Sequence, residues 1–460
     1  MLHCISPIDG SVYVERPYAT DADIATTLKR SVNAGQTWRT LALEERAALC
    51  AALVDAFIAK ADVHATELAW QMGRPIRYGK GEVAGFEDRA RTMIAMAEDA
   101  LADINLPEKP GFTRFIRREP VGVLLTIAPW NYPYLTAANS IIPALMAGNT
   151  VILKHSHQTP LCAERLAEAA ETAGLPEGVF QYLFLDRTQT TDLIQAPEIN
   201  AVAFTGSVAG GAQIEQAAAG RFIPVGLELG GKDPAYVRED ANLAHAIENL
   251  VDGAFFNSGQ SCCGIERIYV HETHYDAFVD GVVALTNQYV LGSPLDEATT
   301  LGPMVRSSAA DFVQGQIDEA IAAGAKALID PTQFDAHQPG TPYMAPQILV
   351  DVDHTMRVMT EESFGPVVGI MKVKSDEEAI ALMNDSDLGL TASIWSQDTA
   401  VALALGSLIE TGTVFLNRCD YLDPELAWTG VKNTGRGYSL SRLGYEQLTR
   451  AKSYHFRTEV

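Results

Sequence analysis

The run Val121-Gly122-Val123-Leu124-Leu125-Thr126-Ile127-Ala128 is short, apolar and followed at once by the loop Pro129-Trp130-Asn131-Tyr132-Pro133. A run of this length that ends at a turn is typical of a buried strand. Beyond it, β-like and helix-like segments alternate along the chain. We predict strands over 150–154, 179–185 and 201–205, and helices over 159–173 and 188–196. This alternation indicates βαβ units around a parallel sheet.

The second half of the chain repeats the alternation after Gly231. Two α/β halves that meet near Gly230-Gly231 predict a cleft between them, where ligands usually bind. The predicted strands of this half span 234–237, 267–271, 367–372, 393–395 and 414–417, and the predicted helices span 275–289, 307–323 and 376–385.

Both ends of the chain add elements outside this alternation. Residues 21–34 and 44–61 carry apolar side chains at helical spacing and predict two amphipathic helices. The segments 112–119 and 452–457 alternate apolar and charged residues, so we predict that they are strands of an arm.

Length and composition exclude several classes of protein. A chain of 460 residues exceeds one ordinary hydrophobic core, so we expect at least two domains. The net charge of −24 disfavours binding to nucleic acid or to an anionic membrane surface. No apolar run reaches the roughly 18–20 residues of a membrane helix, and the N-terminus lacks a signal-peptide pattern. Six cysteines in so long a chain do not form a disulfide framework, which favours the reducing cytoplasm.

Three segments contain the residue types that covalent acyl transfer requires. Cys262 closes the segment Asn257-Ser258-Gly259-Gln260-Ser261-Cys262, although an isolated cysteine usually packs as a small apolar residue. Glu228 lies in Leu227-Glu228-Leu229-Gly230-Gly231-Lys232, where burial would raise its pKa toward the range of a general base. The prolines on either side of Asn131 stiffen its loop and fix its amide, which suits an oxyanion donor. A thiol, a base and an oxyanion donor are therefore present.

These segments resemble those of the NAD(P)-dependent aldehyde dehydrogenases, and the resemblance extends from residue 5 to the C-terminus. It implies oxidation of an aldehyde to a carboxylic acid, with Cys262 as the nucleophile and Cys263 as a packing residue. By the same resemblance, Asn131 and the Cys262 N–H bind the oxyanion. Glu228 activates the water that hydrolyses the thioester, which speaks against the branch of the family that forms acyl-CoA.

The resemblance also implies a division of the chain into parts. A Rossmann-like parallel-sheet domain that binds NAD(P) is expected over 1–102 and 122–230, and a second α/β catalytic domain over 231–432. A small β arm and tail for oligomerisation are expected over 103–121 and 433–460. Members of the family form dimers or tetramers, so we expect a homodimer or a homotetramer.

Several residues match cofactor contacts of the family. The turn Phe204-Thr205-Gly206-Ser207-Val208-Ala209-Gly210-Gly211 joins a strand to a helix, which is a sound place for a phosphate. The resemblance puts this turn, with Trp130, beside the cofactor diphosphate and puts Lys154 on the adenosine ribose. It puts Glu362 on the nicotinamide ribose and Phe364 against the nicotinamide ring. The predicted cofactor contacts are thus Trp130, Lys154, His157, Gly206, Ser207, Gly211, Glu362 and Phe364.

His157 departs from the family pattern, because many NAD-preferring members have a glutamate there that repels a 2′-phosphate. Without that carboxylate the repulsion is absent, and an imidazolium would even attract a phosphate. We therefore predict that both NAD and NADP serve as cofactors.

Two other functions remain open at this level. A cysteine-dependent hydrolase or esterase also uses a thiol, but it requires a histidine base that the sequence does not place. A catalytically silent homologue is the second alternative. His271 and His274 do not have the i, i+4 spacing of a helical zinc pair, so no metal is expected. Tyr132, Asn139, Tyr421 and Trp428 suggest a substrate mouth suited to aliphatic or amino-aldehydes.

Overall fold

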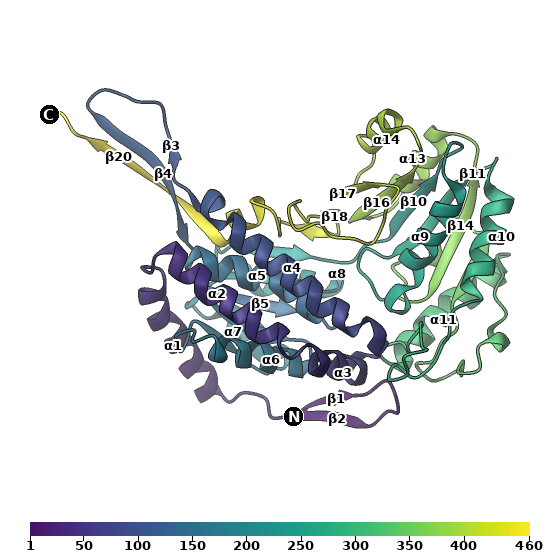
Figure 1. Ribbon diagram of the computed structural model, residues 1–460, viewed down its shortest axis with the longest axis horizontal. Helices are drawn as coiled ribbons and strands as arrows, with labels where there is room; N and C mark the ends of the chain where they lie inside the picture. The colour runs from purple at the N-terminus through teal and green to yellow at the C-terminus, as the bar shows by residue number, and fades with distance from the viewer.

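The computed structural model describes all 460 residues as two α/β lobes and a projecting arm (Figure 1). The first lobe is built on a six-stranded sheet with the order β19-β9-β8-β5-β6-β7, of which β19 alone is antiparallel to its neighbour. The predicted strand over 121–128 is confirmed as β5, and all six of its residues are buried. The strands are β5 (Val123–Ala128), β6 (Thr150–His155), β7 (Phe180–Tyr182), β8 (Ile199–Thr205), β9 (Val225–Glu228) and β19 (Gly435–Arg436).

The order of these strands positions a binding site. The chain runs outward from β5 to β6 and β7, and then returns to β8 on the other side of β5. The loops that follow β5 and β8 therefore leave the sheet in opposite directions at the same edge. In parallel sheets, ligands bind in the crevice at such a switch point. The loop after β5 contains Trp130 and Asn131, and the loop after β8 contains Gly206 and Ser207.

Helices cover both faces of this sheet. Between its strands lie α5 (Pro133–Ala147), α6 (Pro160–Thr172), α7 (Arg187–Gln195) and α8 (Val208–Ala218). A hairpin and four helices precede the sheet, and Trp38, Phe57 and Phe86 from these helices pack in one core with residues of α5. These N-terminal elements are β1 (Leu2–Ile5), β2 (Val12–Arg16), α1 (Asp21–Trp38), α2 (Leu43–Ile58), α3 (Ala61–Met72) and α4 (Ile76–Leu101).

The second lobe contains a seven-stranded sheet with the order β12-β13-β14-β11-β10-β16-β17. All its pairings are parallel except that of β12 with β13. Its strands are β10 (Asp233–Val237), β11 (Ile265–His271), β12 (Lys326–Ala327), β13 (Gln347–Val350), β14 (Val367–Val373), β16 (Thr391–Trp395) and β17 (Thr413–Leu416). Its helices are α9 (Leu243–Phe255), α10 (Tyr275–Thr286), α11 (Ser307–Ala322), α12 (Arg357–Thr360), α13 (Asp376–Asn384) and α14 (Thr399–Gly406).

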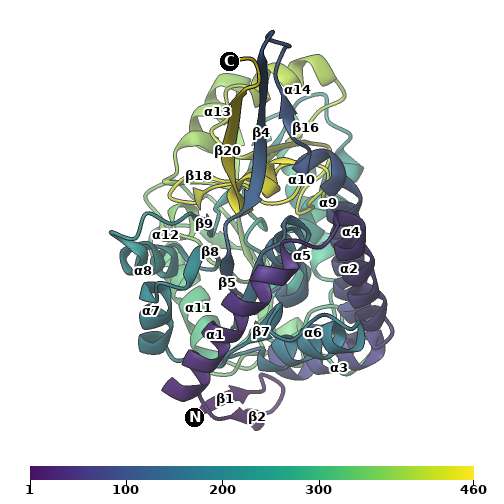
Figure 2. The ribbon, with the colours of Figure 1, turned by 90° about the vertical axis from the view of Figure 1, so that its left-hand side faces the viewer.

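The arm is a three-stranded antiparallel sheet that stands away from both lobes (Figures 1 and 2). It consists of β3 (Ile104–Asn105), β4 (Phe112–Pro120) and β20 (Thr449–Arg457). The two predicted arm strands are confirmed, and they pair along nine residues from Thr449↔Pro120 to Arg457↔Phe112.

Part of the predicted tail contacts the first lobe. β19 pairs with β9, and the Tyr445 hydroxyl donates to the carbonyl of Met93 on α4. We therefore propose that the arm comprises 103–121 and 449–457 and that residues 433–448 complete the first lobe. None of the helices combines the length and apolar character needed to cross a membrane.

Candidate active site

A strained loop presents Cys262. After α9 ends at Phe255, Asn257 and Ser258 have positive φ angles of 52° and 57°, and Gly259 continues the bend at 68°. Non-glycine residues adopt such angles only where the surroundings impose them, often at functional sites. Gly259 lies against the backbone of Gly365, where a Cβ atom would collide with the carbonyl oxygen. The bend is thus fixed by close packing between two loops of the second lobe.

The two adjacent thiols have different surroundings. Cys262 is partly exposed and lines two cavities, whereas Cys263 is buried and lines only one of them. The Cys263 thiol donates to Oδ1 of Asp420 at 3.0 Å. Its hydrogen bond with Cys262 and its burial hold the pKa of Cys263 well above the ordinary value. Cys263 therefore keeps its proton, and Cys262 is the thiol that a ligand reaches.

Asn131 approaches the same loop from the first lobe. Its side-chain Nδ2 donates to the carbonyl of Gln260 at 3.1 Å, two residues before Cys262. The backbone carbonyl of Asn131 accepts hydrogen bonds from Asn257 Nδ2 at 3.3 Å and from Arg74 Nη2 at 2.5 Å. The loop that contains Asn131 and the loop that contains Cys262 are therefore joined directly.

A buried ion pair supports this junction. Arg74 and Glu82 form a salt bridge with side-chain exposures of 2% and 0%. Besides Asn131, Arg74 contacts Asn257 Oδ1 through Nε at 3.3 Å. Glu82 Oε1 accepts the backbone N–H groups of Tyr134 and Leu135, at 2.9 and 3.1 Å. One ion pair thus holds the loops that contain Asn131 and Cys262 and the start of α5.

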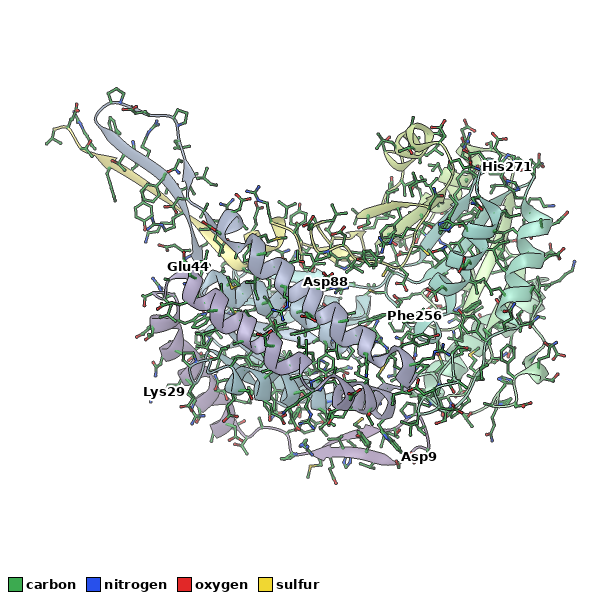
Figure 3. All side chains as sticks on the ribbon, viewed as in Figure 1. Asp9, Lys29, Glu44, Asp88, Phe256 and His271 are labelled. Carbon is green, nitrogen blue, oxygen red and sulfur yellow. The ribbon has the colours of Figure 1, made fainter.

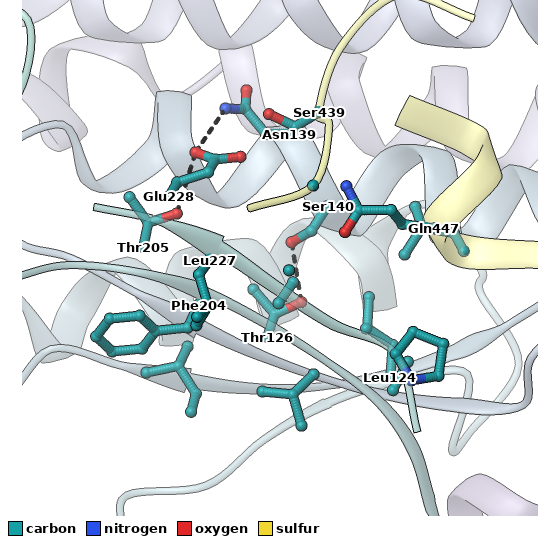
Figure 4. A pocket seen from close by; sticks show the side chains of 18 of the residues that line it. Leu124, Thr126, Asn139, Ser140, Phe204, Thr205, Leu227, Glu228, Ser439 and Gln447 are labelled. Carbon is teal, nitrogen blue, oxygen red and sulfur yellow. Dashed lines mark hydrogen bonds between the residues drawn. The ribbon is translucent and has the colours of Figure 1, made fainter. Parts of the chain in front are cut away.

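Glu228 ends β9 and also faces Cys262 across these cavities, because both residues line each of them. The Thr205 hydroxyl donates to its Oε2 at 3.2 Å, and Asn139 Nδ2 does so at 3.5 Å (Figure 4). Burial raises the pKa of Glu228, and these two hydrogen bonds oppose the increase. Such a carboxyl is suited to accept a proton near neutral pH.

The first of the two cavities lies at the switch point of the first sheet. It is lined from both lobes, and Ser207 Oγ caps α8 by accepting the N–H of Gly210 at 3.1 Å. A helix N-terminus of this kind attracts phosphate. Trp130 and Phe364 meet edge to face at 5.7 Å. The predicted residues that line this cavity are Trp130, Asn131, Gly206, Ser207, Glu228, Cys262, Glu362 and Phe364.

Glu362 in this first cavity has an unsatisfied carboxylate oxygen. Its Oε1 is buried and has no hydrogen-bond partner, and burial together with the charge of Glu266 raises its pKa to about 8. The carboxyl packs so closely on Gly230 that a Cβ there would collide with it. A buried acceptor without a donor fits a ligand with hydroxyl groups, such as a ribose.

Comparisons with known proteins agree with this geometry. The model of the aldehyde dehydrogenase family matches residues 1–454. The chain belongs to this family. It is 34% identical to an NADP-dependent succinate-semialdehyde dehydrogenase of Mycolicibacterium paratuberculosis, over 98% of this chain and 95% of that protein. It is 33% identical to a 3,6-anhydro-alpha-L-galactose dehydrogenase of Streptomyces coelicolor, over 100% and 94%.

Solved structures share the whole fold of this aldehyde dehydrogenase. A succinic semialdehyde dehydrogenase of Streptococcus pyogenes, in complex with NADP+, superposes with a TM-score of 0.95 at 29% identity, over 99% of this chain and 100% of that one. An NADP-dependent glyceraldehyde-3-phosphate dehydrogenase of Bacillus halodurans, complexed with NADP, gives 0.93 at 32% identity, over 99% and 96%. The enzyme oxidises aldehydes with NAD or NADP, and the first cavity has the groups to hold such a dinucleotide.

Three predicted cofactor residues of the aldehyde dehydrogenase do not line the first cavity. Lys154 lies near the end of β6, beside β5, and burial lowers its pKa to about 8. Gly211 packs against Leu229, so its place in the structure is explained by helix–sheet packing. His157 Nε2 hydrogen-bonds the carbonyl of Leu185 at 2.7 Å.

Burial favours the neutral form of His157 over an imidazolium. Burial, and then the charge of Lys154, lower the pKa of His157 below its ordinary 6.5, despite the hydrogen bond to Leu185. The lowered pKa disfavours an imidazolium, and position 157 carries no carboxylate that would repel a 2′-phosphate.

The second cavity shares Cys262 and Glu228 with the first cavity. Its walls come from α4, α5, α9 and the loop that follows β17. Its residues beyond Cys262 and Glu228 include Asp88, Arg89, Tyr132, Leu135, Asn139, Thr205, Asp252, Phe256, Asp420, Tyr421, Leu422 and Trp428. Sequence reasoning anticipated Tyr132, Asn139, Tyr421 and Trp428 but missed the three aspartates, which belong to no motif.

Other functional neighbours were also missed. The start of α11 contributes Arg306, Ser308 and Phe312 to the wall of the first cavity. The helix start predicted at residue 307 was the only feature of the sequence that pointed to this region. No signal in the sequence pointed to the Arg74–Glu82 pair. The structure contains no group of three or more metal-ligating side chains, and His274 instead contacts the carbonyl of Glu239.

Proposed function

We propose that Cys262 is the nucleophile of this aldehyde dehydrogenase. Its thiolate adds to the aldehyde carbonyl, and the resulting oxyanion is bound by Asn131 Nδ2 and the Cys262 N–H. For this step Asn131 exchanges its bond to the Gln260 carbonyl for the oxyanion. NAD(P)+, held in the first cavity by residues such as Trp130, Ser207 and Phe364, would supply the hydride acceptor for the oxidation. The product of oxidation is then a thioester on Cys262.

In the second half of the reaction, Glu228 removes a proton from water, and the hydroxide attacks the thioester. The carboxylic acid leaves and Cys262 regains its thiolate. The raised pKa of Glu228 suits this role, because a base works best when its pKa lies near the working pH. The observation that carries the proposal is that Cys262 and Glu228 line both cavities, where these two cavities meet.

Transient kinetics at 340 nm test these assignments. We expect Cys262→Ala to form no NAD(P)H from any aldehyde, while Cys263→Ala forms it. Glu228→Gln should keep a first burst of one NAD(P)H per site but lose about 10²–10⁴-fold in steady-state turnover. Turnover by Cys262→Ala, or a Glu228→Gln enzyme without a burst, would overturn the proposed roles.

The cysteine-hydrolase alternative lacks a base in this structure. No histidine lines either cavity, and Glu228 is the carboxyl residue that lines both of them. The silent-homologue alternative disagrees with membership of the enzyme family and with the presence of Asn131, Glu228 and Cys262 together.

We infer that NADP is used at least as readily as NAD. The support is the neutral ring at position 157, together with the NADP dependence of the relatives named above. Ratios of kcat/KM for the two cofactors test this, and a preference for NAD of about a hundredfold, or 2.8 kcal/mol, would contradict it.

We also propose a cytoplasmic homodimer or homotetramer. All six cysteines are free, which suits a reducing compartment. The arm exposes Phe456 and an array of aromatic and basic side chains that a second subunit would cover. Light scattering on the purified protein measures the assembly. The names of the relatives suggest an anionic semialdehyde as substrate, but the charges of the second cavity disagree with that suggestion.

A further inference from the structure

Three aspartates line the second cavity, and none of them forms an ion pair. Asp88 lies on α4, Asp252 on α9 and Asp420 in the loop after β17. Asp88 and Asp252 are exposed. Figure 3 shows Asp88 and Phe256, which both line the cavity, close to the junction of the lobes. Because Cys262 also lines this cavity, these carboxylates face the space through which the aldehyde reaches the nucleophile.

Asp420 is the deepest of the three. Its Oδ1 accepts the Ser261 hydroxyl at 2.7 Å and the Cys263 thiol at 3.0 Å, so it touches the residues on either side of Cys262. Its Oδ2 has no hydrogen bond within the protein. Burial raises the pKa of Asp420, and the nearest opposing charge is Arg74, which is already paired with Glu82. A half-buried carboxylate without an ion-pair partner is costly, and a cationic ligand would remove that cost.

The one cation in the cavity wall is committed elsewhere. Arg89 Nη1 donates to the carbonyl of Leu135 at 3.1 Å and to Asn139 Oδ1 at 3.0 Å. Burial lowers its pKa, while the charges of Glu82 and Glu228 oppose that decrease. The charge of Arg89 therefore compensates Glu82 and Glu228, and the three aspartates have no cation in the cavity wall to compensate them.

The rest of the wall is suited to an ammonium group. Four aromatic side chains line the cavity, and their ring faces attract cations. They are Tyr132, Phe256, Tyr421 and Trp428. The rings of Tyr132 and Tyr421 already have the guanidinium groups of Arg74 and Arg418 over them, at 4.6 and 3.2 Å from the ring centroids, so Phe256 and Trp428 are the rings left for a ligand.

We propose that the substrate is a cationic aldehyde, with an amino or quaternary ammonium group at the end remote from the carbonyl, and that Asp420, assisted by Asp252, selects for this charge. The proposal rests on the proposed function of Cys262 and takes the second cavity as the route by which the aldehyde reaches it. It assigns to this enzyme a substrate of opposite charge to succinate semialdehyde. The reaction that supplies such a substrate would oxidise or transaminate a diamine, or oxidise an amino alcohol.

The test compares three aldehydes that differ in charge. They are 4-(trimethylammonio)butanal, its neutral isostere 5,5-dimethylhexanal, and succinate semialdehyde. We expect kcat/KM for the cation to exceed that for the isostere by about tenfold or more, which is 1.4 kcal/mol, and to exceed that for the anion further. This advantage should shrink as salt is added, because screening weakens exposed charges such as Asp252.

Two variants locate the effect. Asp420→Asn and Asp252→Asn should each reduce the ratio between the cation and its isostere, and the double variant should bring it close to one. The neutral isostere reports any damage to Cys262 itself, since it does not depend on the charge. Asp423→Asn, an exposed change in the same loop, is the matched control and should leave the ratio unaltered.

The possible results separate the two proposals. An enzyme that oxidises the isostere or the anion at least as well as the cation refutes the cationic substrate and leaves the roles of Cys262 and Glu228 intact. A preference for the cation that survives both aspartate changes refutes the assignment to Asp420 and Asp252. If no aldehyde of the three gives NAD(P)H, the proposed function fails with it.

Discussion

Replacing Glu82 by glutamine should destabilise the enzyme far more than a typical carboxylate change. Glu82 is fully buried and neutralises Arg74, whose side chain is 2% exposed. In the Glu82→Gln variant, the oxygen of the new amide would still accept the N–H groups of Tyr134 and Leu135. The NH2 group of that amide, however, would face the guanidinium, so a donor would meet a donor and Arg74 would lose its counterion.

The cost follows from the burial of the pair. Breaking a buried ion pair by removing one partner typically costs about 3–5 kcal/mol. The matched change Glu87→Gln lies five residues along α4 and breaks an exposed i, i+4 pair with Arg91 at 2.8 Å. Exposed pairs of this kind contribute only about 0.3–0.5 kcal/mol. We therefore expect the melting temperature to fall by about 3–5 °C for Glu82→Gln and by less than about 1 °C for Glu87→Gln.

Thermal and denaturant melts of the two variants measure this difference. Activity at a temperature where Glu82→Gln stays folded adds a second readout, because the Arg74 contacts with Asn131 and Asn257 position the catalytic loops. Adding Arg74→Leu to Glu82→Gln should recover part of the stability, since it removes the orphaned charge. Equal melting of Glu82→Gln and Glu87→Gln would refute this account of the site's support.

Three further changes test single contacts. Asn131→Ala should lower kcat by about 10²–10³-fold, the usual loss for one oxyanion donor, as measured under saturating aldehyde. Thr205→Val removes a donor that favours the ionised form of Glu228, so the pKa of Glu228 should rise and the pH profile of deacylation should move to higher pH; an unmoved profile would contradict that contact. His157→Glu should lower kcat/KM for NADP by about tenfold and leave that for NAD close to its original value, because it introduces a charge that repels a 2′-phosphate.

Much of the fold follows from local patterns in the sequence. The strands over 150–154 and 201–205 were predictable because their apolar residues are buried on both sides by helices, which removes ambiguity about their faces. β7 is shorter than its predicted span of 179–185, since only Phe180–Tyr182 pair with β6. The end of the chain was harder to assign, because the pairing of β19 with β9 joins residues about 200 apart, and no local pattern reports such a contact.

The site divides in the same way. Cys262, Glu228 and Asn131 lie in distinctive segments, and the structure brings all three to the first cavity. Asp420, Asp252 and Asp88 come from three elements that are distant in the sequence. They line one cavity only because the folded lobes bring these elements together. His157 shows a further limit, because its pKa depends on burial and on the carbonyl of Leu185, 28 residues away.

The positions of the charges connect stability with specificity. The first lobe neutralises its buried cation: Arg74 is paired with Glu82, and the pair serves the loops that hold Asn131 and Cys262. Asp420, on the loop that the second lobe contributes, receives two neutral donors and no cation. Lys232 and Glu266 show the other arrangement, a buried carboxylate with a basic partner. Its absence at Asp420 means that the missing positive charge is best supplied by the substrate.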